Sequence, residues 1–153
     1  MLKYVIAIPL IVHGLANLGG VFAPWTKNMQ GFKDAAWLFS QNTTFKSGVG
    51  KAFSLVWLAS TICLVTAGAG LLLEQPWWVP VAIAGCICSL VAILPWWKAV
   101  VTGAYFGAVF DVVVSILLLS PLRGFLPGYP INQALCKIRG KFPTDFLNEK
   151  RNK

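Results

Sequence analysis

Two titratable side chains lie deep inside long apolar stretches of this chain, where they could do chemistry. His13 falls within the first apolar stretch and Asp111 within the last. A titratable group surrounded by hydrocarbon is costly enough to need a partner or a function. These two residues are therefore the first candidates for a functional site.

Smaller polar side chains accompany both residues at helical spacing. Asn17 follows His13 by four positions, so the two would occupy one face of a helix. The last stretch carries a small or polar residue every four positions, namely Gly103, Gly107, Asp111 and Ser115. Such a stripe lets another helix approach closely. We predict helix packing through Gly103 and Gly107. For the polar residues we predict ligand or proton-relay roles, namely for His13, Asn17, Asp111 and Ser115.

His13 and Asp111 each lie near the middle of their apolar stretch. Both would reach the midplane of a bilayer whichever way the protein points, so this shared depth allows them to touch. An imidazole–carboxyl pair could relay protons or hydrogen-bond a carbonyl such as a quinone headgroup. Two alternatives stay open, because the polar groups could simply join helices or could line a transport pathway.

Four apolar stretches position these side chains. They cover residues 4–22, 52–73, 78–97 and 99–119, and each is near the roughly 20 residues that a helix needs to cross a bilayer. The chain is 57% hydrophobic and only 12% charged, far below the charge of a soluble domain. We predict an all-α fold, an antiparallel four-transmembrane-helix bundle over residues 1–119. The bundle is predicted to have a long first loop, 23–51. It is followed by a basic C-terminal tail, 120–153, which we expect to be partly associated with the membrane surface.

Aromatic residues mark the expected membrane boundaries. Trp25, Trp57 and Trp96 would share one side of the membrane and form an aromatic belt there. The first loop carries small and aromatic residues at helical spacing, which predict a short interfacial helix: Phe32, Ala35, Ala36 and Phe39. Asn42-Thr43-Thr44 has the form of an N-glycosylation sequon, a pattern that often arises by chance.

The net charge of +8 is spread over both ends of the predicted bundle. This distribution favours attraction to membrane lipids and argues against a nucleic-acid partner. Lys and Arg residues are more numerous in the N-terminus and tail than in the loops that would face the other side. The positive-inside rule therefore favours cytoplasmic termini.

Several kinds of cofactor chemistry are excluded by the residues available. With one histidine, the chain cannot hold a haem between two of its own imidazoles. The apolar stretches also lack the ligands of a metal cluster, so no metal or haem is expected from this chain alone. No CxxC motif is formed by the four cysteines, which are Cys63, Cys86, Cys88 and Cys136. A thiol–disulfide enzyme is disfavoured, and the cysteines of the apolar stretches are expected to be small packing residues.

Several of these features together resemble the DoxX-like membrane proteins over about residues 1–119. The residues that carry the resemblance are His13-Gly14 with Asn17, an aromatic first loop, and the second-span end formed by Gly68, Gly70, Leu71, Leu72 and Leu73. The resemblance implies a four-helix bundle in a prokaryotic cell membrane, with cytoplasmic termini and a link to thiosulfate:quinone oxidoreduction or redox-partner complexes. In that family a basic residue often stands where this chain has Asn17.

Three function classes follow. The first is a redox-associated membrane subunit with a quinone- or lipid-sized pocket around His13, Asn17 and Asp111. The second is a non-catalytic accessory subunit, in contact with other membrane subunits or with copies of itself. The third is a small proton-coupled carrier, which ranks last because the chain shows no repeated halves with matching broken helices.

Overall fold

A computed structural model describes residues 1–120 of the protein. Its helices are α1 (Leu2–Ala16), α2 (Leu18–Phe22), α3 (Gly48–Leu72), α4 (Trp78–Ile93) and α5 (Thr102–Leu119), with 3-10 turns η1 (Ala23–Trp25) and η2 (Leu94–Trp96). Two short strands, β1 (Ala36–Trp37) and β2 (Ser40–Thr44), lie between η1 and α3. Four helical segments are long and apolar enough to cross a membrane, namely Leu2–Trp25, Gly48–Leu72, Trp78–Trp96 and Thr102–Leu119. The predicted mainly helical, four-helix architecture is thus confirmed.

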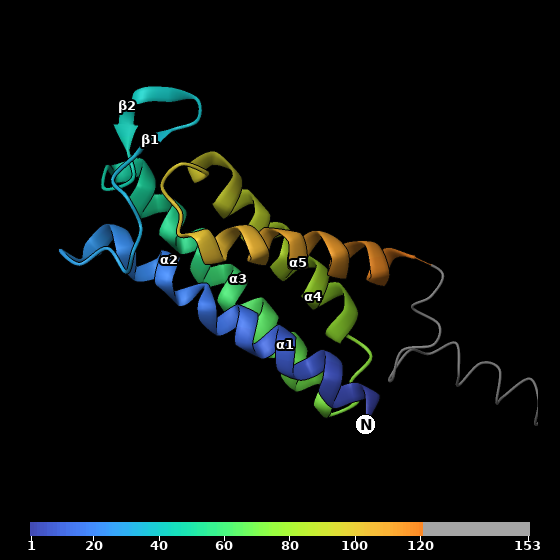
Figure 1. Ribbon diagram of the computed structural model, residues 1–153. Coiled ribbons are helices and arrows are strands. Elements are labelled where there is room, and N and C mark those ends of the chain that lie inside the picture. Colours follow the sequence, from blue (N-terminus) through green and yellow to red (C-terminus); the bar gives the residue numbers. More distant parts are fainter. Residues whose placement is uncertain (121–153) are drawn as a thin grey trace, which may run out of the picture.

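The long helices are arranged so that α1 packs along α3, α3 along α4, and α4 along α5 (Figure 1). The outer helices α1 and α5 make far less backbone contact with each other than with their neighbours. The N-terminus and the end of α5 lie at one end of the bundle, and the strands lie at the other. The predicted basic tail and Cys136 lie outside the described residues, apart from Ser120.

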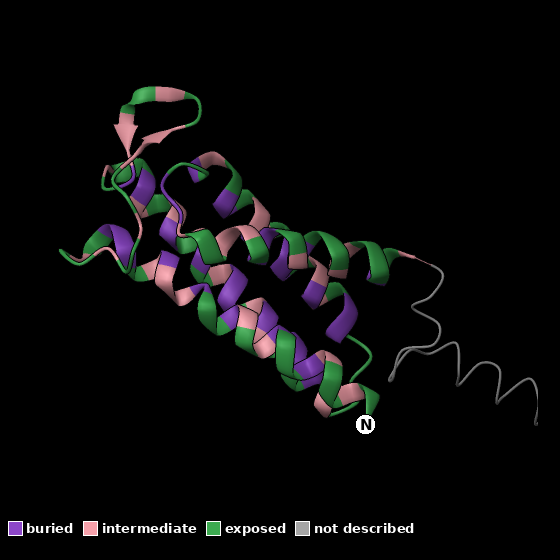
Figure 2. Ribbon diagram, in the orientation of Figure 1, coloured by how far each residue is buried: buried purple, intermediate pink, exposed green. Residues whose placement is uncertain are grey.

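Small residues let the inner helices approach closely. A Cβ at Gly68 of α3 would crowd Ile11 and the backbone of α1, and one at Gly85 of α4 would crowd Leu64 of α3. Buried residues line the interior of the bundle (Figure 2). Many large apolar side chains are exposed on its outside. Cys86 is buried and Cys63 is half-buried, as expected of packing residues.

A tight turn joins α3 to α4 at the end where the N-terminus lies. Glu74 adopts a left-handed conformation there, with φ of 57°. Its carboxylate accepts a hydrogen bond of 2.7 Å from Lys3 Nζ, which ties the start of α1 to this turn. The hydrogen bond and then the charge of Lys3 lower the pKa of Glu74.

The interfacial helix predicted in the first loop is wrong, because residues 32–35 are not helical and an antiparallel strand pair follows within residues 36–44. Ala36 pairs with Thr44, and Trp37 pairs with Ser40. Backbone bonds hold the loop on the bundle, since Lys33 N–H donates to Ala99 and Leu38 N–H donates to Pro95. These long-range bonds and the burial of aromatic rings outweigh the local helical spacing of the loop.

The predicted aromatic belt is also wrong for two of its three members. Trp57 is 2% exposed and Trp96 is fully buried, whereas Trp25 is 60% exposed. The two buried indoles pack edge-on against Phe45, with ring centroids 5.7 Å and 5.2 Å apart. The loop brings Phe45 down onto the bundle, so tryptophans that sequence alone places at a lipid interface lie inside the protein. We call Trp37, Phe45, Phe53, Trp57 and Trp96 the aromatic cap.

Candidate functional site

The structure brings His13 of α1 and Asp111 of α5 together across the bundle. His13 Nε2 and Asp111 Oδ1 form a hydrogen bond of 2.9 Å. The Asp111 side chain is fully buried, and the His13 side chain is 12% exposed. A proton shared by such a pair fixes the orientation of the imidazole, whose Nδ1 is left for other contacts.

Gly107 explains how the imidazole reaches this position. A Cβ at residue 107 would lie 2.7 Å from His13 Cε1, so any larger residue would displace the ring. The ring of Phe110 flanks the imidazole, with centroids 4.8 Å apart. Gly107 therefore makes room for a side chain, which differs from the predicted close approach of two backbones.

Gly103 does not take the packing role predicted for it. A Cβ at Gly103 would meet no atom within 4 Å, because this residue faces open space at the start of α5. Gly103 borders the cleft described below and not a neighbouring helix. The four-residue stripe thus has two different environments along its length.

Behind the pair, Asp111 faces polar groups of α4 and α5. The buried Cys86 of α4 lies close to both Asp111 and Ser115. Asp111 Oδ2 and Ser115 Oγ are enclosed and have no hydrogen-bond partner among residues 1–120. Ser115 lies one turn beyond Asp111, and neither residue lines the cleft described below. Asp111 therefore contacts the imidazole from the side away from the cleft.

Asn17 joins three helices. Its Nδ2 donates to Ser60 Oγ of α3 at 2.9 Å and to Ser89 Oγ of α4 at 3.5 Å. Ser60 Oγ in turn donates to the carbonyl of Gly85. Asn17 separates α1 from α2, and these bonds hold this break in the helix against the bundle.

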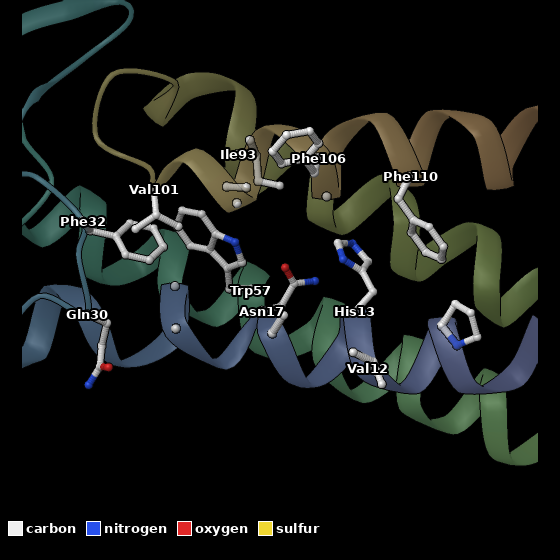
Figure 3. A pocket seen from close by; sticks show the side chains of 17 residues that line it. Val12, His13, Asn17, Gln30, Phe32, Trp57, Ile93, Val101, Phe106 and Phe110 are labelled. Carbon is white, nitrogen blue, oxygen red and sulfur yellow. The ribbon is translucent and has the colours of Figure 1, made fainter.

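A cleft of about 620 Å³ lies between α1–α2 and α5. His13 and Asn17 enter it from α1, Phe110 from α5, and Trp57 from α3 (Figure 3). Ligand pockets for drug-sized molecules have about 300–1,000 Å³. The cleft is therefore large enough for a ring and the beginning of an attached chain.

The lining of the cleft is mostly apolar. Among the residues described, no Asp, Glu, Lys or Arg lines it, and the polar side chains are those of His13, Asn17 and Gln30. Val12 and Phe106, on opposite walls, are 58% and 75% exposed on the outside of the bundle. The cleft therefore opens sideways between α1 and α5.

Sequence reasoning found His13, Asn17 and Asp111 but missed several residues of this site. The sequence alone places Trp57 in an aromatic belt and does not distinguish Ser60 or Ser89. Both serines are isolated polar residues within apolar spans, which is the signal that could have identified them. Within residues 1–120, no three His, Cys, Asp or Glu side chains gather as a metal site would require.

Comparison of the chain with protein-family models, with curated proteins and with solved structures gave no match. The resemblance to DoxX-like proteins therefore depends on the residues quoted above and stays a prediction.

Proposed function

We propose that this protein is an integral membrane protein that binds an uncharged, ring-bearing lipid of the quinone class in the cleft between α1 and α5. The single observation that carries the proposal is an oriented imidazole at the wall of a lipid-sized cleft whose lining is mostly apolar and holds no charged side chain among residues 1–120. We further propose that the termini are cytoplasmic, so that the strand end of the bundle faces the opposite side.

The lining supports an uncharged ligand over a phospholipid headgroup. Recognition of a phosphate relies on Arg, Lys or backbone N–H groups at a helix N-terminus. The cleft offers no such cation among the described residues. Its aromatic side chains instead match a flat ring, and His13 and Asn17 match the oxygen atoms on that ring.

The lateral opening supports arrival of the ligand from the bilayer. In four membrane-crossing helices, the exposed Val12 and Phe106 would face acyl chains, and the cleft between them would face the same region. A lipid could place its ring inside and leave its tail between α1 and α5. His13 is near the middle of the segment Leu2–Trp25, so in a membrane the cleft would lie within the hydrocarbon region.

The experiment compares two glycine variants in the purified protein. Gly103→Leu would place a branched side chain in the cleft, and Gly48→Leu is its matched control. Gly48 is also in the first turn of its helix, and a Cβ there also meets no atom within 4 Å, but it does not line the cleft. Leu is the better helix former, so neither change should destabilise the fold.

Binding of a benzoquinone with a decyl chain is measured by calorimetric titration in detergent. We expect affinity to fall about tenfold or more in Gly103→Leu, a loss of about 1.4 kcal/mol, and to be unchanged in Gly48→Leu. Equal affinity in the two variants would place the ligand elsewhere. Absence of binding to the unaltered protein would refute the proposal and leave the accessory-subunit interpretation in its place.

A further inference from the structure

The orientation of the Asn17 carboxamide is fixed by the hydrogen bonds behind it. Ser60 has one hydroxyl proton, which it donates to the carbonyl of Gly85. Ser60 Oγ must therefore accept its bond from Asn17, and the Asn17 atom at 2.9 Å must be the Nδ2 donor. Ser89 lies on the same side of the amide, at 3.5 Å. The amide nitrogen is thus directed to α3 and α4.

The oxygen of the same amide is left for the cleft. Asn17 Oδ1 has no hydrogen-bond partner among residues 1–120, yet it is not one of the enclosed unpartnered atoms. Asn17 is a lining residue, and its carboxamide extends into the cleft between Trp57 and His13 (Figure 3). The cleft therefore presents an amide oxygen, which accepts hydrogen bonds and cannot donate them.

Trp57 supplies the complementary group. The nitrogen edge of its indole faces Asn17 in Figure 3. Trp57 Nε1 likewise has no partner in the described part of the chain and is not one of the enclosed atoms. An indole N–H only donates. One ligand atom between the two side chains would therefore have to accept from Trp57 and donate to Asn17.

We propose that the cleft selects a ligand that carries a hydroxyl group, so that it binds a quinol in preference to the corresponding quinone. A hydroxyl both donates and accepts, whereas a quinone carbonyl would satisfy Trp57 and leave Asn17 Oδ1 unpaired. This inference rests on the proposed function. In it Asn17 is the residue that determines specificity, and Ser60 is the residue that positions Asn17.

The geometry of α1 accommodates the rest of such a ring. His13 and Asn17 are one turn apart, a rise of about 5.4 Å along the helix. The two hydroxyl oxygens of a para-quinol are separated by a similar distance. A ring held at Asn17 would therefore direct its second hydroxyl toward His13, whose imidazole is oriented by Asp111.

The test uses four ligands of matched chain length with the purified, unaltered protein, under anaerobic conditions. They are a decyl benzoquinol, its oxidised quinone, its dimethyl ether and a simple alkyl alcohol. We expect the quinol to bind about tenfold or more tightly than the quinone and the ether, because each of these leaves a buried acceptor unpaired. Tighter binding of the alcohol than of the quinone and the ether would also support the requirement for a hydroxyl group. The natural ligand would then be a hydroxyl-bearing lipid other than a quinol.

Two buried serines of α3 provide the matched variants. Ser60→Ala removes the acceptor that fixes Asn17, so the amide can rotate and present Nδ2 to a carbonyl. The preference for quinol over quinone should then fall to about threefold or less. Ser54→Ala is the control, because Ser54 also accepts from a side chain, Trp25, and donates to a backbone carbonyl, that of Lys51. It does not line the cleft, so the preference should be retained.

The outcomes separate this inference from the proposed function. Binding of quinone as tightly as quinol by the unaltered protein would overturn the inference and leave the proposed function standing. Failure of all four ligands to bind would overturn both. Loss of preference in Ser54→Ala to the same extent as in Ser60→Ala would show that Asn17 is not the group that discriminates.

Discussion

Removal of either member of the His13–Asp111 pair should destabilise the protein, and by unequal amounts. His13→Ala would leave both oxygens of a fully buried carboxyl without a partner, because Oδ2 already has none within residues 1–120. Breaking a buried pair in this way costs about 3–5 kcal/mol. Asp111→Ala leaves the imidazole, which borders the cleft and is 12% exposed. That variant should cost less, about 1–3 kcal/mol.

The double variant should cost clearly less than the two single variants together, since neither group is then left alone. We expect a coupling free energy of about 1–3 kcal/mol. Unfolding by SDS in mixed micelles, followed by tryptophan fluorescence, measures the four free energies of the cycle. Ser54→Ala combined with His13→Ala is the control and should be additive. Additivity of His13→Ala and Asp111→Ala would refute the pairing and the orientation of the imidazole with it.

Three further predictions concern other parts of the molecule. Gly107→Leu should lower the free energy of unfolding by about 1–3 kcal/mol through overlap with the imidazole, whereas Val109→Leu on the exposed face of α5 should leave it within about 0.5 kcal/mol. Equal values for the two variants would contradict the position of the ring. An impermeant maleimide should label Gln41→Cys from outside the cell and Gln75→Cys only after lysis, and the reverse pattern would invert the proposed orientation. The folded state lowers the pKa of Glu74. Its ion pair with Lys3 therefore stabilises the protein at pH values above the ordinary carboxyl pKa of about 4.3, and this stabilisation is lost as the pH falls through the pKa of the folded state. In Glu74→Gln, the free energy of unfolding should therefore fall less steeply as the pH is lowered into the acid range. An unchanged pH dependence would show that other carboxyl groups control it.

The sequence predicts the helices well because long apolar stretches have few alternatives to membrane-crossing helices. The boundaries differ at the ends, where α3 begins at Gly48 and α5 at Thr102. Shared depth was enough to predict that His13 and Asp111 could meet, since two polar groups in hydrocarbon have few other partners.

The first loop and the cleft could not be predicted in the same way. The strand pair and the aromatic cap depend on contacts between residues far apart in the chain, such as Phe45 with Trp96. The open side of Gly103 depends on the angle between α5 and α1, which no local spacing encodes. A glycine that makes room for a helix and one that leaves a cleft look identical in a sequence.

The hydrogen bonds of α1 have a consequence for how the protein is made. Asn17 finds its partners 43 and 72 residues later in the chain, and His13 finds Asp111 98 residues later. At roughly 5–20 residues per second, the ribosome needs about 5–20 s to complete that last interval. Ser60 and Ser89 are made earlier in this interval, but until it ends the His13 imidazole has no Asp111 in the nascent chain to bond. In the proposed membrane topology, water or the insertion machinery would therefore have to solvate this imidazole until the fourth helix is made.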